Sequence, residues 1–177
     1  FSERMCKHFE EDFGMNVRVV RFHNVYGPEG TWRGGREKAP AALSRKIIEA
    51  KRNDDLKIEV WGDGEQTRSF MYIDDCISGL DKLMNSDFSD PINLGRSELV
   101  SINQMIDMIS EIAGVEVERV HNLDAPQGVR GRNSDNTLIL EKLGWEPEVD
   151  LRAGLAKTFA WIEEQVEKEA RGESVIS

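Results

Sequence analysis

Hydrophobic residues recur at helical spacing in several stretches of this 177-residue chain. In the first stretch, Met5, Phe9 and Phe13 stand at every fourth position, which predicts an amphipathic helix over residues 2–13 that ends at Gly14. Further helices are expected over residues 40–51, 74–85, 102–113, 136–143 and 151–169. Helices therefore make up much of the predicted fold.

Side chains that accept hydrogen bonds from a helix N-terminus stand before three of these helices. Ser101 is expected to cap helix 102–113, and Asp74 is expected to cap helix 74–85, with Ile77 among the residues that face its interior side. Helix 136–143 is expected to be capped near Ser134 or Asp135. These caps set the predicted helix starts.

Nearly continuous apolar runs alternate with the helices and predict buried strands. Residues 16–22 hold Val17, Val19, Val20 and Phe22, a density typical of a parallel strand that is covered on both faces. Other extended segments are expected at residues 57–61, 69–73, 91–94 and 115–120. The order helix, glycine, buried strand is that of a βαβ unit, so an α/β fold is predicted, with ligands bound by loops at the carboxyl ends of strands.

Glycines and cations gather in three segments, residues 27–40, 61–70 and 128–135. Glycine allows a backbone to approach a ligand closely, and arginine forks match phosphate oxygens. Around Trp32 the mixture of glycines, cations and an indole favours a site for a phosphorylated, ring-shaped ligand over buried structure. The plainer alternatives are a flexible loop for the first segment, a hairpin with a polar return strand for the second, and a solvated loop for the third.

The overall charge narrows the classes of partner. A net charge of −10 disfavours nucleic acid, whereas an acidic body with local cationic segments suits a small anionic ligand. Membrane association is not expected, because no stretch reaches the roughly 20 apolar residues of a membrane span. Cys6 and Cys76 are too few for a disulfide scaffold and are expected to be core thiols of a cytoplasmic protein. The three histidines lack metal-ligand spacing, so no metal site is expected.

Several motifs occur in an order that resembles the C-terminal half of extended short-chain dehydrogenase/reductases acting on nucleotide sugars. They are His23-Asn24-Val25-Tyr26-Gly27, Trp61-Gly62-Asp63-Gly64, Tyr72-Ile73-Asp74-Asp75 and Asn93-Leu94-Gly95. Within this group, residues 30–42 and 128–135 are most similar to the GDP-mannose 3,5-epimerases, and the resemblance covers residues 1–170.

The resemblance implies a fold and a division into domains. Residues 1–25 would be the tail of a Rossmann-like NAD-binding domain, and residues 26–170 would form mainly a smaller α/β substrate-binding domain. Within the latter, residues 70–95 would pack back on the Rossmann part, and residues 171–177 would be a tail. The NAD-binding glycine motif, a catalytic cysteine and a Tyr-x-x-x-Lys pair would lie upstream of Phe1, so the chain is expected to be the C-terminal portion of a larger, homodimeric protein.

The site residues follow from the same resemblance, position by position. Lys38 would be the catalytic general acid/base, and His23 would lie against the nicotinamide end of NAD. Oxidation of the hexose C4 to a ketone would acidify the protons on C3 and C5, and a lysine can move such a proton if its pKa is lowered, with Arg33 and Arg36 helping if they lie close. The implied substrate-binding residues are Asn24, Glu37, Lys38, Ala39, Lys46, Gln66, Thr67, Arg68 and Arg132.

These residues together imply an NAD-dependent epimerisation of a nucleotide sugar, GDP-mannose to GDP-L-galactose. The chain would be the substrate-binding portion and would be inactive alone. The alternatives are another nucleotide-sugar epimerase or a 4,6-dehydratase, a non-catalytic nucleotide-sugar binding module, and a pure interaction domain.

Overall fold

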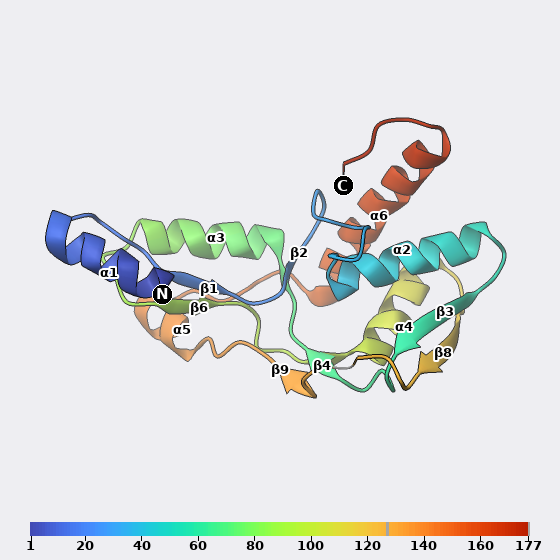
Figure 1. Ribbon diagram of the computed structural model, residues 1–177, viewed down its shortest axis with the longest axis horizontal. Coiled ribbons are helices and arrows are strands. Elements are labelled where there is room, and N and C mark those ends of the chain that lie inside the picture. Colours follow the sequence, from blue (N-terminus) through green and yellow to red (C-terminus); the bar gives the residue numbers. More distant parts are fainter. Residues whose placement is uncertain (127, 177) are drawn as a thin grey trace.

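The computed structural model describes residues 1–126 and 128–176, and it confirms the α/β fold class. Two regions lie side by side along the longest axis of the molecule (Figure 1). The first, which we call the β1 region, contains α1 (Ser2–Phe13), β1 (Val20–Phe22), α3 (Ile73–Met84), β6 (Ile92–Leu94) and α5 (Thr137–Leu143). The second, the α2 region, contains α2 (Ala39–Arg52), β3 (Lys57–Trp61), α4 (Ile102–Ala113), β8 (Glu118–Asn122) and α6 (Leu151–Ala170).

Short strands run between the two regions. They are β2 (Val25–Tyr26), β4 (Thr67–Arg68), β5 (Met71–Tyr72), β7 (Val100–Ser101) and β9 (Gly131–Arg132). β1 pairs in parallel with β6, β2 with β5, and β3 with β8, while β4 lies between β7 and β9. The hairpin interpretation of residues 61–70 is therefore wrong, because β3 and β4 belong to different sheets.

Several strands have other bounds than expected, because hydrogen bonding to a partner decides where a strand starts and ends. The segment expected at residues 69–73 is a strand only over β5 (Met71–Tyr72), and Ile73 begins α3. β1 begins at Val20 instead of residue 16, since its register with β6 covers only the three pairs from Val20–Ile92 to Phe22–Leu94. β8 begins at Glu118 instead of residue 115 and continues to Asn122, opposite the whole length of β3.

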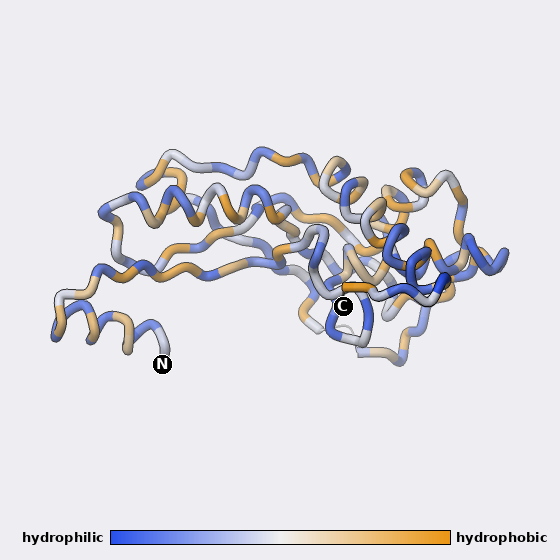
Figure 2. Tube along the Cα trace, turned by 90° about the horizontal axis from the view of Figure 1, so that it is seen from above, coloured by the Kyte–Doolittle hydropathy of each residue, from blue (hydrophilic) through white to orange (hydrophobic). Residues whose placement is uncertain are grey.

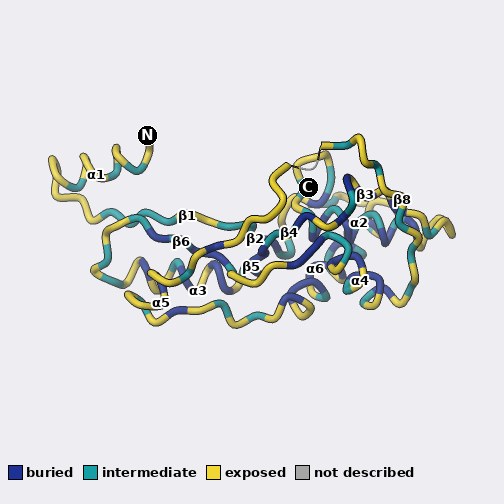
Figure 3. The backbone as a smooth tube through the Cα atoms, turned by 90° about the horizontal axis from the view of Figure 1, so that it is seen from below, coloured by how far each residue is buried: buried dark blue, intermediate teal, exposed yellow. Residues whose placement is uncertain are grey.

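The α2 region has a large contiguous core. Helices α2, α4 and α6 contribute apolar side chains that are completely buried, among them Ile47, Ile106 and Leu155. Figure 3 shows buried residues along these helices. The predicted cap of α4 is confirmed, because Ser101 accepts from the backbone N–H of Gln104 while the Gln104 side chain accepts from the N–H of Ser101.

The β1 region has a smaller core. It is formed by Met71, Cys76, Leu83, Ile92, Leu94, Ile139 and Trp145. Helix α1 ends at Gly14 in the left-handed conformation (φ 64°), as expected, but none of its residues is buried. It stands at the edge of the molecule with apolar positions open to solvent (Figure 2).

Helix α3 differs from its prediction in its cap and its buried face. It begins at Ile73 after Tyr72, so Asp74 lies in the first turn and is not the cap. Ile77 is 60% exposed, because the buried face runs through Asp75, Cys76, Gly79 and Leu83. In α5 the N-cap position is Asn136, which makes no side-chain capping bond, while the predicted Asp135 accepts from the N–H of Thr137 with its Oδ1 at 3.0 Å.

Asp75 links the two regions. Its buried carboxylate accepts hydrogen bonds from the backbone N–H groups of Glu148 (3.0 Å) and Val149 (3.1 Å), just before α6. Among the helices of residues 1–126 and 128–176, none has both the length and the apolar character needed to cross a membrane.

Candidate functional site

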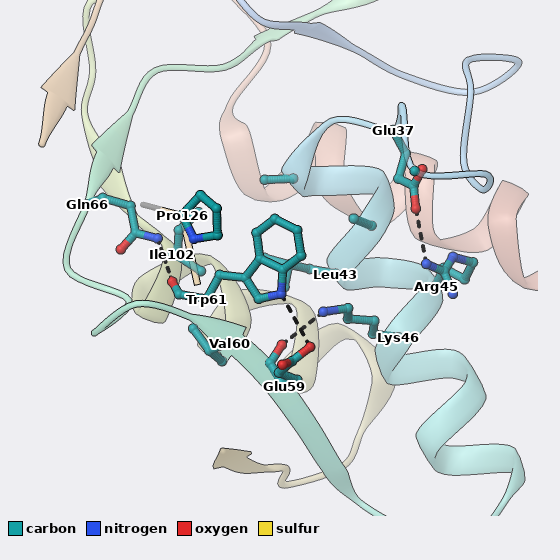
Figure 4. A pocket seen from close by; sticks show the side chains of 13 residues that line it. Glu37, Leu43, Arg45, Lys46, Glu59, Val60, Trp61, Gln66, Ile102 and Pro126 are labelled. Atoms are coloured by element: carbon teal, nitrogen blue, oxygen red, sulfur yellow. Dashed lines mark hydrogen bonds and ion pairs between the residues drawn. The ribbon is translucent and has the colours of Figure 1, made fainter. Parts of the chain in front are cut away.

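A pocket of about 490 Å³ lies between α2, β3 and the start of α4 (Figure 4). Four of the predicted substrate-binding residues line it, namely Glu37, Ala39, Lys46 and Gln66. Its volume is in the range of small-molecule sites. The structure therefore brings together side chains from two of the three cationic segments, and Pro126, just before the third, also lines the pocket.

The walls combine an apolar floor with an exposed aromatic ring. Leu43, Val60 and Ile102 supply the apolar surface, and the Trp61 side chain lies among the lining side chains in Figure 4. Trp61 is 53% exposed, although its indole N–H reaches Glu59 Oε2 at 3.3 Å. An indole held at one end and open on its face can stack on a planar ring.

The Glu37 carboxylate is the most buried charge in the pocket wall, with 7% of its side chain exposed. Its Oε1 accepts from Arg45 Nη2 at 3.0 Å, and its Oε2 has no hydrogen-bond partner among the described residues. Burial acts to raise the pKa of Glu37, but hydrogen bonds from its own backbone N–H, from Arg45 and from the backbone of Gly35 together hold that pKa below its usual value. Glu37 is therefore a buried carboxylate with one oxygen, Oε2, that lacks a hydrogen-bond partner among the described residues.

Gln66, which lines the same pocket, carries a second buried acceptor without a partner among residues 1–126 and 128–176. Its Nε2 donates to the carbonyl of Trp61 at 2.9 Å, which fixes the amide, while its buried Oε1 has no partner within the described part of the chain. Unpartnered buried acceptors are costly, so a ligand that brings N–H or O–H donors would be favoured here. Lys46 adds a cation whose Nζ donates to the carbonyl of Glu59 at 2.9 Å.

Lys38 lies at the N-cap position of α2, between two residues that line the pocket. Its backbone is extended (φ −74°, ψ 157°), its carbonyl accepts from the N–H of Ala42 at 2.9 Å, and its side chain is exposed. Arg33, expected as a possible neighbour, instead forms an ion pair with Glu169 of α6. Arg36 is exposed. The geometry thus gives Lys38 an open position at the start of the helix.

The interpretation of Trp32 as part of a ligand-gripping segment is wrong. Trp32 is only 1% exposed, and its indole N–H donates to the carbonyl of Ile176 at 2.5 Å. The ring is buried and hydrogen-bonded to the C-terminal segment, so it anchors the loop and does not face solvent.

A second group of predicted residues lies at the carboxyl end of β1 and does not line the pocket. His23 donates its backbone N–H to the carbonyl of Leu94 at 3.0 Å, and the amide of Asn24 donates to the carbonyl of Ser69 at 2.9 Å. A Cβ on Gly95 would stand 2.6 Å from the Cβ of His23 and 2.7 Å from that of Ser134, so only glycine permits this approach. The third cationic segment therefore packs against the ends of β1 and β6.

Arg68 and Arg132 are direct partners on the parallel strands β4 and β9, and Thr67 pairs with Gly131 beside them. Burial, and then the charge of Arg132, lower the pKa of His23 below its usual value, so the imidazole is neutral near pH 7. Arg130 joins the second and third segments by an ion pair to Asp63 (2.8 Å). Two adjacent arginines on neighbouring strands form a surface suited to phosphate.

Sequence reasoning missed Arg45, Glu59, Trp61 and Pro126 as pocket residues. An aromatic residue directly before the Gly62-Asp63-Gly64 turn was the available signal for Trp61. The others needed the spatial arrangement of α2 and β3. Among the described residues, no group of three or more His, Cys, Asp and Glu side chains could hold a metal ion.

Parallel strand pairs, polar side chains beyond their carboxyl ends and a pocket of small-molecule size are the arrangement found in α/β proteins that bind ligands. The chain matches the model of the NAD dependent epimerase/dehydratase family over residues 1–95, and it belongs to that family.

Two curated relatives refine this placement. The chain is 54% identical to GDP-mannose 3,5-epimerase 1 of Oryza sativa subsp. indica over 168 residues, which cover 95% of this chain and 43% of that protein. It is 52% identical to GDP-mannose 3,5-epimerase of Arabidopsis thaliana over 175 residues, which cover 98% and 45% respectively. The resemblance seen in the motifs is confirmed, and the chain spans a little under half the length of these relatives.

A solved structure supports the same fold. UDP-glucose 4-epimerase of Thermotoga maritima, determined with UDP-glucose, superposes with a TM-score of 0.82 at 28% identity, covering 93% of this chain and 52% of that chain.

Proposed function

We propose that this chain is the substrate-binding portion of an NAD-dependent epimerase that converts GDP-mannose to GDP-L-galactose. The observation that carries the proposal is the pocket, where Glu37, Lys46 and Gln66 meet although they come from separate segments. The identity of 52–54% to GDP-mannose 3,5-epimerases supports the choice of substrate.

Each predicted residue has a role in this proposal. Glu37, Ala39, Lys46 and Gln66 bind the nucleotide sugar in the pocket, and Thr67, Arg68 and Arg132 bind its diphosphate. Asn24 contacts the substrate at the end of β1. Lys38 moves the proton at C3 or C5 of the hexose, for which its exposed position at the start of α2 leaves the ammonium group room to reach the sugar.

The residues present fit a contact with NAD at one point. His23 carries a neutral, partly buried ring at the carboxyl ends of two parallel strands, which is where cofactors bind in such sheets. NAD, when bound, supplies the hydride acceptor for the reaction. The other NAD-binding groups would lie outside this chain, so we propose that the chain alone is inactive.

The proposed division into domains corresponds only in part to the two regions of the molecule, because α5 (Thr137–Leu143) also lies in the β1 region. Residues 1–25 would be the tail of the NAD-binding domain, and residues 26–170 would form mainly the substrate domain, with residues 70–95 packing back and residues 171–177 as a tail. The shared small core of α3 and β6 supports the packing of residues 70–95. We also propose that the full-length protein is a cytoplasmic homodimer, and the unpaired thiols of Cys6 and Cys76 are in keeping with a reducing compartment.

The test is the Lys38→Ala variant of the full-length protein. Loss of the acid/base group should lower epimerisation of GDP-mannose by about 10²- to 10⁴-fold. Product formation and the exchange of the C5 proton in D₂O are followed by NMR. Lys51→Ala is the matched control, because Lys51 lies on the same helix and donates to the carbonyl of Ala113, away from the pocket.

Two results would contradict the proposal. Normal C5 exchange in Lys38→Ala would remove the catalytic role of Lys38. A C4 epimer or a 4-keto-6-deoxy sugar as the product would show instead another epimerase or a 4,6-dehydratase.

A further inference from the structure

We infer that Arg45 is a positioning residue, which holds the Glu37 carboxylate at the pocket wall and couples it to an anchor formed by Trp32 and the C-terminal segment. The inference rests on the proposed function, because it concerns how the same pocket binds the nucleotide sugar. It concerns a residue outside the predicted substrate-binding set.

The planar guanidinium group of Arg45 donates hydrogen bonds to three different residues. Its Nη2 donates to Glu37 Oε1 at 3.0 Å, its Nη1 donates to Glu49 Oε2 at 2.9 Å, and its Nε donates to the carbonyl of Trp32 at 3.2 Å. Since a guanidinium group is planar and rigid, three acceptors fix its orientation. Figure 4 shows the Glu37–Arg45 pair bridging the loop and α2.

The loop that carries Glu37 contains two glycines with left-handed backbone angles. Gly34 and Gly35 stand between Trp32 and Glu37 with φ angles of 88° and 82°, and a Cβ on either would meet no atom within 4 Å. Glycine restricts its backbone less than any other residue, so this stretch by itself constrains the Glu37 side chain weakly. Beside the backbone N–H groups of Glu37 and Gly35, the hydrogen bond from Arg45 is the side-chain contact that holds the Glu37 carboxylate.

The other end of this connection is anchored under the C-terminal segment. The Trp32 indole donates to the carbonyl of Ile176, and the N–H of Ile176 donates in turn to Oε1 of Gln165 at 3.3 Å. Gln165 is buried on α6, and Arg33 lies over the Trp32 ring, 5.1 Å from its centroid. The anchor thus ties the loop to the core of the α2 region. Arg45 connects the anchored Trp32 to Glu37, because it donates to both residues.

A carboxylate that is already held in place favours ligand binding, because binding then causes no further loss of its conformational entropy. Glu37 lines the pocket and its Oε2 is buried without a hydrogen-bond partner among the described residues, and we infer that a donor of the nucleotide sugar becomes its partner. If Arg45 acts through Glu37, its loss should raise KM and leave kcat nearly unchanged.

The experiment is a double-mutant cycle in the full-length protein, with Arg45→Met, Glu37→Gln and the double variant. Affinity for GDP-mannose is measured by calorimetry, and KM and kcat by product formation. We expect Arg45→Met to weaken binding roughly tenfold in the wild-type background and to have no further effect when Glu37 is already Gln. Arg52→Met is the matched control and should bind normally, since Arg52 lies on α2 and donates to the carbonyl of Val166.

Two milder variants keep the test decisive if Arg45→Met does not fold. Arg45→Lys keeps the charge but not the three contacts, and Trp32→Phe keeps an aromatic ring but not the indole N–H. Each should raise KM with an unchanged kcat, and the effect of Arg45→Lys should vanish in the Glu37→Gln background.

Three outcomes overturn the inference. Additive effects of Arg45 and Glu37 would show that Arg45 contacts the ligand directly. A fall in kcat at constant KM would assign Arg45 to the chemical step. Absence of GDP-mannose binding in the wild-type protein would instead overturn the proposed function, and the inference with it, so the two failures are distinguishable.

Discussion

The α2 region and the β1 region have equally clear helical patterns but very different cores. Helix α4 turns its apolar face, including Met105, Ile106 and Ile109, into a large cluster and buries it completely. Helix α1 places Met5, Phe9 and Phe13 on one face as well, and these side chains stay exposed. The difference teaches that periodicity predicts a helix, whereas burial depends on what packs against it.

This contrast has a simple physical basis in the sheet. The β1 region contains one parallel pair, β1 and β6, and parallel strands are normally covered on both faces. Here α3 and α5 pack near the pair, and α1 is tied to it by an ion pair between Arg21 and Glu3 (2.6 Å). The exposed apolar side chains of α1 and β1, among them Phe9, Phe13 and Phe22, are in keeping with the proposal that residues 1–25 are the tail of a larger domain.

The largest expected effect compares a buried helix of the α2 region, α6, with the exposed helix α1 of the β1 region, both in the 177-residue chain. Leu155→Ala removes a completely buried side chain of α6 and should lower the free energy of unfolding by about 2–5 kcal/mol. Phe9→Ala in α1 should cost about 1 kcal/mol or less, because its ring is half exposed and packs mainly on Phe13. Urea unfolding followed by circular dichroism measures both. Equal losses would show that α1 is packed as firmly as α6 and would break the comparison.

The next effect concerns the link between the regions. Asp75→Ala leaves the N–H groups of Glu148 and Val149 without their acceptor and should cost about 1–3 kcal/mol in thermal or urea unfolding. Asp75→Asn keeps one acceptor oxygen and should cost less. Asp74→Ala is the control, because its exposed carboxylate has only a 3.8 Å contact with Lys157. If Asp74→Ala were as damaging as Asp75→Ala, the link would not depend on these backbone contacts.

The smallest expected effect is a change in the pKa of His23, which follows the end of β1. The pKa of His23 is lowered in the folded state, so the unfolded chain takes up a proton first as the pH falls below about 6.5. The free energy of unfolding therefore decreases with falling pH until His23 is protonated in the folded state as well. Arg132→Met should raise the pKa of His23 only part of the way to its usual value, since burial is the larger cause. NMR titration of the imidazole measures the change. Arg130→Met, which removes the pair with Asp63, should leave that pKa in place, and an equal shift in both variants would deny Arg132 a specific role.

The helices could be predicted from the sequence because their signals are local. The spacing of Met5, Phe9 and Phe13 and the Ser101–Gln104 capping box each act within a few residues. Strand partners could not be predicted in this way, since β3 pairs with β8 and β4 with β9 through contacts between distant segments. The hairpin interpretation failed for that reason, and Ile77 was misplaced because Asp75 turns inward to meet the segment before α6.

The candidate site was predicted by resemblance and not by local chemistry. Glu37 and Gln66 carry no signal in the sequence that they share a pocket, and this emerged only from the packing of α2 on β3. Trp32 shows the opposite error, because an indole among glycines and cations is typical of ligand sites, yet here it is covered by the C-terminal segment. Its partner lies 144 positions away along the chain, beyond the reach of any local pattern.

The long-range strand pairing has a consequence for how the molecule forms. Val20 must find Ile92, and Lys57 must find Glu118, before either pair can stabilise the other elements. Closing such loops costs entropy that no contact has yet offset, and folding rates fall as the contacting segments move apart in sequence. The chain should therefore acquire its helices early and its sheets late, and the newly made protein passes through a period in which its apolar strands are unprotected against aggregation.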